Sequence, residues 1–135
     1  MTTREDLESY LLRMDLDYEE VDDGMWIVKP QGDGTNIVVH YSPPVVVLRL
    51  KVMEIQPGGD DGRYTALYRK LLELNATDIV HGSYGIEAEE VVLSDALELE
   101  TLDFGELRSS YESMFLAASS HLPELVGLVP VAQEG

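Results

Sequence analysis

The longest strand-like run in this 135-residue chain is VVVLRLKVMEI, which occupies residues 45–55. Its even positions from 46 to 52 hold only apolar side chains, while bases interrupt its odd positions. Successive side chains of a strand point to opposite faces of a sheet. The alternation therefore predicts a long strand that buries its even face, made of Val46, Leu48, Leu50 and Val52.

The odd face of the same strand mixes two bases with hydrophobic side chains. If helices cover only the even face, these hydrophobic side chains are left exposed to solvent. An exposed apolar patch of that extent is typical of a binding surface. We therefore predict a partner-binding surface formed by Val45, Val47, Arg49, Lys51, Met53 and Ile55.

The residues before the long strand predict a helix followed by two or three strands. A helix is expected over residues 3–16, because Thr3 and Asp6 have the spacing of a capping box. Strands are expected over 25–30 and 36–41, with a possible short first strand over 17–23 and a turn over 31–35. The pair Pro43-Pro44 then interrupts strand pairing, since neither residue has a backbone N–H to donate.

After the long strand the pattern changes to helix, two strands and helix. A loop over 57–62 leads into a helix over 63–74. Two strands follow over 79–84 and 87–93, around a turn at Gly85, and residues 96–100 are a possible further strand. The last helix is expected over 103–121, ended by Pro123, with a frayed tail over about residues 130–135.

The expected order is thus α-β-β-β-α-β-β-α, with a possible extra strand at either end, over 17–23 and over 96–100. Hairpin-linked strands flanked by helices are typical of an α+β fold, in which an antiparallel sheet is covered mainly on one side. The length fits a single domain over residues 1–135.

The second helix has an unusually wide apolar face. Its apolar side chains span an arc of about 160°, whereas a helix that lies on one sheet needs about 100°. They are Tyr64, Leu67, Tyr68, Leu71, Leu72 and Leu74. We predict a homodimer with Tyr64, Leu67, Tyr68 and Leu71 at its interface. The alternative is a helix that lies deep in the core of its own chain.

Charge and composition restrict the function. The chain has 26 acidic and 9 basic residues, so its formal net charge is -17. Such a surface repels phosphate backbones and anionic lipids, which argues against nucleic-acid or membrane partners. It suits basic partners, or it serves only to keep the protein soluble. The absence of cysteine excludes disulfides. Short apolar runs and a polar N-terminus lead us to expect a cytoplasmic protein.

The search for catalytic or metal-binding motifs favours a protein that is not an enzyme. His40, His81 and His121 match no zinc-ligand spacing, so no metal or cofactor is expected. The stretch HGSYG at 81–85 lacks the first glycine of a nucleophile elbow, and a β-hairpin explains it better. A small serine hydrolase that uses Ser83 and a histidine remains as a hypothesis of another class.

Two local stretches resemble a known family. The runs LLELN at 71–75 and GSYGI at 82–86, followed by a strand and an amphipathic helix, are similar to the YbjN family and its type III secretion chaperone-like fold. The resemblance implies a homodimer that holds an extended segment of another protein. It also implies an alternative, a regulatory module that binds a folded signalling partner. It implies no catalytic residue.

Overall fold

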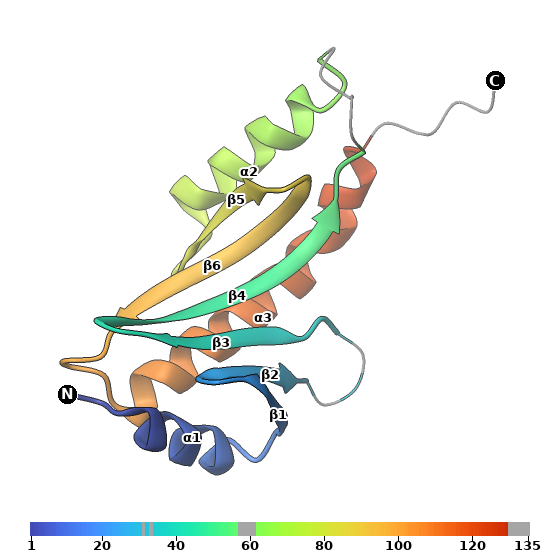
Figure 1. Cartoon of the computed structure of the whole chain (residues 1–135). Coiled ribbons are helices and arrows are strands. Elements are labelled where there is room, and N and C mark those ends of the chain that lie inside the picture. Colours follow the sequence, from blue (N-terminus) through green and yellow to red (C-terminus); the bar gives the residue numbers. More distant parts are fainter. Residues whose placement is uncertain (31, 33, 57–61, 130–135) are drawn as a thin grey trace.

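The computed structural model describes residues 1–30, 32, 34–56 and 62–129 (Figure 1). The tail expected over 130–135 lies outside the described residues. The same holds for most of the loop expected over 57–62 and for two positions of the turn expected over 31–35.

The described residues form three helices and six strands, in the predicted order with the extra first strand present. In chain order they are α1 (Arg4–Arg13), β1 (Asp17–Asp22), β2 (Met25–Lys29), β3 (Ile37–Ser42), β4 (Val45–Glu54), α2 (Thr65–Thr77), β5 (Ser83–Glu87), β6 (Glu90–Glu98) and α3 (Phe104–Gly127). The capping box at Thr3 and Asp6 is present and begins α1.

All six strands belong to one antiparallel sheet with the order β1-β2-β3-β4-β6-β5. β4 lies inside the sheet, between β3 and β6. β6 is the last strand in the sequence, but in the sheet it lies between β4 and β5. The two edge strands are therefore β1 and β5. The structure thus confirms the predicted antiparallel α+β fold.

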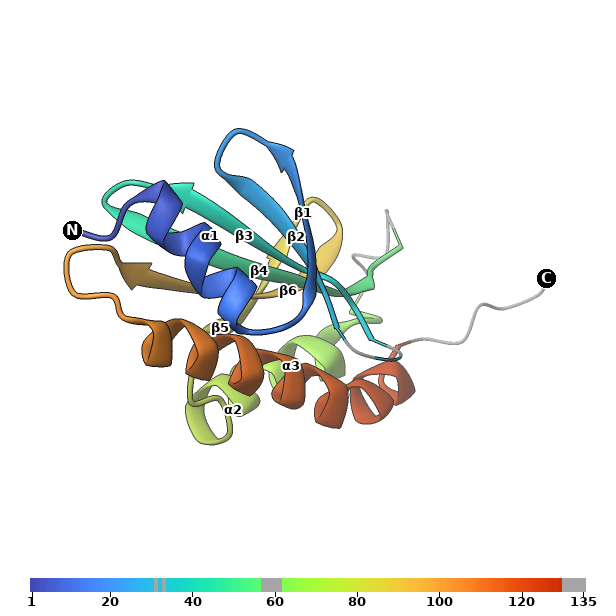
Figure 2. The ribbon, with the colours of Figure 1, turned by 90° about the horizontal axis from the view of Figure 1, so that it is seen from below.

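The even face of β4 forms the centre of the core, as predicted. Val46, Leu48 and Leu50 are at most 1% exposed. Inward side chains of neighbouring strands and of all three helices complete this core: Trp26, Val28, Ile37, Val39, Leu93, Leu7, Leu67 and Leu107 are among them. Figure 2 shows α2 and α3 together on one side of the sheet. The helices therefore cover one face.

The last hairpin turns later than the sequence suggested. The turn lies at Ala88 and Glu89, whose φ angles are 48° and 64°, and not at Gly85. Gly85 instead pairs with Val92 inside the ladder. A type I′ hairpin turn needs two central residues with positive φ, and the pairing of β5 with β6 outweighs the preference of glycine for turns. The possible strand at 96–100 is mostly the end of β6.

The last helix does not end at Pro123. α3 continues through Pro123 to Gly127, so that prediction was wrong. A proline inside a helix removes one backbone hydrogen bond. The turn after Pro123 places Leu125 in the core with no exposed surface. Burial of a leucine side chain contributes about 1.5–3 kcal/mol, enough to offset much of that loss.

Candidate functional site

The face of the sheet opposite the helices carries a patch of half-buried apolar side chains. We call Met25, Ile27, Val38, Val45 and Val47 the outer strip. Cross-strand pairing sets these residues side by side: Ile27 is opposite Val38, and His40 lies between Met25 and Val47. None of the five packs against the buried core, unlike Val52. The outer strip is therefore an apolar surface that no helix of the described residues covers.

Two of the residues predicted for this surface lie elsewhere. Ile55 is only 4% exposed, and Met53 packs against the core. The pairing of β4 with β6 shifts between Lys51 and Met53, which marks a bulge. A bulge inserts one residue and so exchanges the two faces of the strand beyond it. The predicted surface is thereby reduced to Val45, Val47, Arg49 and Lys51.

Sequence reasoning missed the parts of the strip that lie on β2 and β3. Met25 and Ile27 alternate with the buried Trp26 and Val28, and Val38 lies between the buried Ile37 and Val39. This alternation was visible in the sequence. Only the order of the strands, β2-β3-β4, shows that these side chains form one surface with those of β4.

The two bases of the predicted surface are already ion-paired within the chain. Arg49 Nη1 lies 2.6 Å from Glu87 Oε1. Lys51 Nζ lies 2.7 Å from Glu54 Oε1 and 3.0 Å from Glu90 Oε2. The hydrogen bond between Lys51 and Glu54 raises the pKa of Lys51 and lowers the pKa of Glu54. An incoming carboxylate must displace one of these partners.

Two shallow depressions mark the outer face. One, of about 220 Å³, is lined by Met25, Val38, His40, Val47 and Arg49. The other, of about 420 Å³, is lined by Val47, Gly82, Ser83, Ser94, Asp95 and Ala96. Both include Val47, so they adjoin near the start of β4. Their position suits side chains of a chain laid across the strands.

The predicted dimer interface changes as well. Leu67, Leu71 and Tyr64 are 0%, 4% and 4% exposed, so they belong to the core of the single chain. The reason is that α2 contacts both β5 and α3, with an ion pair of 3.0 Å between Lys70 Nζ and Glu124 Oε1. For these three residues the alternative prediction holds, in which the helix lies deep in the core of its own chain and not at a dimer interface. Only Tyr68 of the predicted set is exposed, at 40%.

The residues of the hydrolase hypothesis do not come together. Within the described residues, no hydrogen bond joins Ser83 to a histidine. The Tyr84 hydroxyl instead lies 2.8 Å from His121 Nδ1, and His121 Nε2 lies 2.8 Å from Asp78 Oδ2. Burial, and then the nearby Asp78 carboxylate, raise the pKa of Tyr84 to about 12. This network joins β5, α3 and the end of α2.

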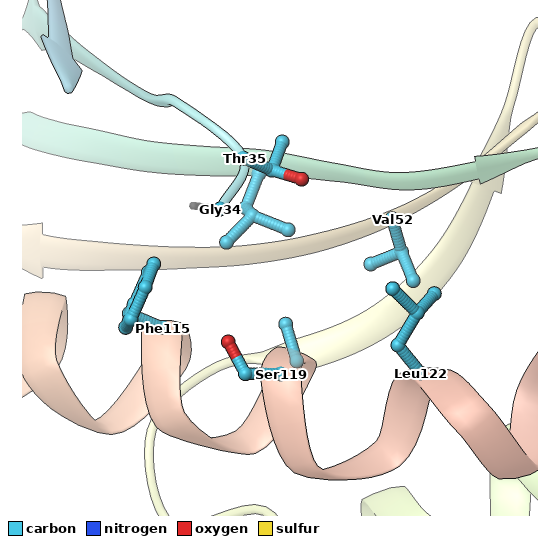
Figure 3. Close-up of a pocket in the computed structure, with 8 residues that line it drawn as sticks. Gly34, Thr35, Val52, Phe115, Ser119 and Leu122 are labelled. Atoms are coloured by element: carbon cyan, nitrogen blue, oxygen red, sulfur yellow. The ribbon is translucent and has the colours of Figure 1, made fainter. Parts of the chain in front are cut away.

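A small apolar pocket lies on the helix side, between α3 and β4 (Figure 3). Its volume is about 60 Å³, and Leu50, Val52, Phe115, Ala118 and Leu122 form its apolar wall. Gly34 closes one side, since a Cβ there would lie 2.7 Å from Cε2 of Phe115. The pocket has room for a single small side chain.

In the described ranges, no group of three His, Asp or Glu residues is placed to hold a metal ion. No helix found there combines the length and the apolar character needed to cross a membrane.

Comparison with known families matches the CesT_Tir_1 family over residues 1–130. The chain belongs to this family. CesT_Tir_1 is a type III secretion chaperone family. No curated protein sequence matches the chain.

Solved structures show the same fold at low sequence identity. A chain of the heterodimeric ExoU-SpcU complex from the type III secretion system of Pseudomonas aeruginosa is 15% identical, with a TM-score of 0.66, over 87% of this chain and 95% of that one. YbjN from E. coli is 13% identical, with a TM-score of 0.64, over 90% and 93%. A chain of the ExsC-ExsE complex is 12% identical, with a TM-score of 0.63, over 98% and 100%. The resemblance noted in the sequence is thereby confirmed.

Proposed function

We propose that this CesT_Tir_1 family member is a non-enzymatic, secretion chaperone-like module that holds a polypeptide segment of another protein on the outer strip. The observation that carries the proposal is the contrast between the two faces of β4. Leu48 has no exposed surface, whereas its neighbour Val47 faces solvent beside Met25 and Val38. Apolar side chains gathered on an uncovered sheet face mark an interaction surface.

The two edges of the sheet differ in a way that supports this function. At the β5 edge, Asn75 binds the backbone of Tyr84: its Nδ2 donates to Tyr84 O at 3.1 Å, and its Oδ1 accepts from Tyr84 N at 2.7 Å. At the other edge, β1 pairs only with β2 in the described residues. A segment that leaves the outer strip can therefore add backbone hydrogen bonds at β1.

Similar proteins occur in complexes of this kind. Chains with this fold are found in the heterodimeric ExoU-SpcU complex and in the HopA1-SchA chaperone-effector complex. By analogy with these complexes, the proposal includes the binding of a secreted protein by this chain. The similarity to YbjN, a proposed transcription regulator, favours a second candidate in which the same face binds a folded signalling protein.

Site-specific photo-crosslinking in the native host tests the proposal. A photoreactive amino acid at Val47 should crosslink one partner protein, while the same residue at Leu116, which is 67% exposed on α3, should not. Val47→Asp should abolish co-purification of that partner, and Leu116→Asp should leave it intact. Equal behaviour of the two positions would exclude the outer strip as the binding site.

The identity of the partner separates the two candidate functions. Capture of an unfolded segment of a secreted protein supports the chaperone-like function. Capture of a folded regulator through the same position supports the second candidate.

A further inference from the structure

The unpaired charges of the outer face are mainly negative. Glu19 is opposite Ile27 and Glu98 is opposite Val45, so both carboxylates lie on the outer face, at the two ends of the outer strip. Both are exposed, and neither has an ion pair or hydrogen bond among the described residues. Asp17 is opposite Lys29 at the β1 border of the same face.

The bases of this face are less available than its acids. Arg49 and Lys51 are held by Glu87, Glu54 and Glu90, as described above. Lys29 is the only other lysine or arginine on the strands of this face in the described residues. The bound segment therefore meets more free carboxylates than free cations.

We propose that the segment held on the outer strip is basic and amphipathic, with apolar residues between two flanking lysine or arginine residues. This inference rests on the proposed function and adds the chemistry of the partner. The flanking bases pair with Glu19 and Glu98, and the apolar residues cover Ile27, Val38 and Val47. A second copy of this chain is disfavoured as the occupant, because it would bring its own charge of -17.

The geometry sets the spacing of those bases. Four strand-to-strand steps separate β1 from β6, which is about 19 Å at the usual distance between strands. Cross-strand pairing across the sheet aligns Glu19 of β1 with Ser94 of β6. Glu98 lies four residues further along β6 than Ser94, which adds about 13 Å along the strand direction. The diagonal is about 23 Å, the length of about seven extended residues.

Selection from a random dodecapeptide display library tests this chemistry without a known partner. Peptides selected on the wild-type protein should be enriched in lysine or arginine on both sides of an apolar stretch, about six to eight residues apart. A synthetic peptide of the selected consensus then serves as the probe. Its affinity should fall as sodium chloride rises from about 50 to about 500 mM, since salt screens exposed charges.

Paired variants separate local charge from net charge. Glu19→Gln with Glu98→Gln should weaken binding of the probe about 2- to 10-fold and flatten its salt dependence, as expected for two exposed ion pairs. Glu73→Gln with Glu112→Gln changes net charge equally on helices α2 and α3 and should leave binding unchanged. Equal weakening by both pairs would overturn the inference.

The same experiment distinguishes this inference from the proposed function. Selected peptides that lose binding in Val47→Asp but lack flanking bases contradict the inference alone. Selected peptides that bind Val47→Asp as well as wild type contradict the outer strip as the binding site, and so contradict both.

Discussion

His121 Nε2 lies 2.8 Å from Asp78 Oδ2, and this contact joins the last third of α3 to the C-cap residue of α2. The other ring nitrogen of His121 lies 2.8 Å from the Tyr84 hydroxyl. With the imidazole proton on Nε2, the histidine donates to Asp78 and accepts from Tyr84. Two hydrogen bonds thus hold α3 against β5 and the end of α2, about forty residues earlier in the sequence.

Tyr84→Phe should destabilise the fold by about 0.5–1.5 kcal/mol, the usual net value of one hydrogen bond. The substitution removes the hydroxyl that bonds to His121 and keeps the ring. Urea denaturation measures the change in the free energy of unfolding. Tyr68→Phe is the matched control, because Tyr68 is exposed and its ring is kept too. Equal stability of Tyr84→Phe and wild type would show that the bond contributes nothing.

Tyr84 should also make stability depend on alkaline pH. Its pKa is raised to about 12 in the folded protein, whereas an unfolded tyrosine has a pKa near 10. The unfolded chain therefore loses this proton first, so the stabilising contribution is complete below about pH 10 and is lost as pH rises towards 12.

Urea midpoints measured between pH 9 and pH 11.5 test this dependence. The wild-type midpoint should fall more steeply over that range than the midpoint of Tyr84→Phe, which lacks the titrating group. Tyr111, whose pKa is also raised by burial, is present in both proteins and cancels in the comparison. Parallel pH profiles would contradict the prediction.

Neighbouring residues of β4 should respond in opposite ways to substitution. Leu48→Ala should lower the free energy of unfolding by about 2–5 kcal/mol, because Leu48 has no exposed surface and the change leaves a cavity. Val47→Asp should change it by less than about 1 kcal/mol, since Val47 is on the uncovered face. Thermal or urea denaturation of both variants measures these changes in the free energy of unfolding. Unfolding of Val47→Asp would show that the outer strip is part of a covered core.

The homodimer predicted from α2 now depends on the exposed side chains of that helix. Tyr68 and Leu72 are 40% and 69% exposed. Light scattering at tens of micromolar should give about twice the chain mass, and Leu72→Glu should give a folded monomer. Leu116→Glu, an equal change on α3, should remain dimeric. A wild-type monomer at that concentration would contradict the dimer.

Local sequence was enough for the order of the elements and for the centre of the core. The alternation of Val46, Leu48 and Leu50 with Val47 and Arg49 depends only on the two-residue period of a strand, so it predicted both faces of β4 correctly as far as Lys51. The capping box at Thr3 was equally readable, because a helix cap is made by residues three positions apart.

Tertiary structure decided what depends on residues far apart in the chain. Ile55 turns into the core because β4 forms a bulge against β6, about forty residues later. Leu67 and Leu71 are core residues because α3 and β5 close over α2, and α3 passes Pro123 because Leu125 is buried. The outer strip exists only through the order of the strands in the sheet. A periodic pattern reports which side chains share a face, but only long-range packing determines what covers that face.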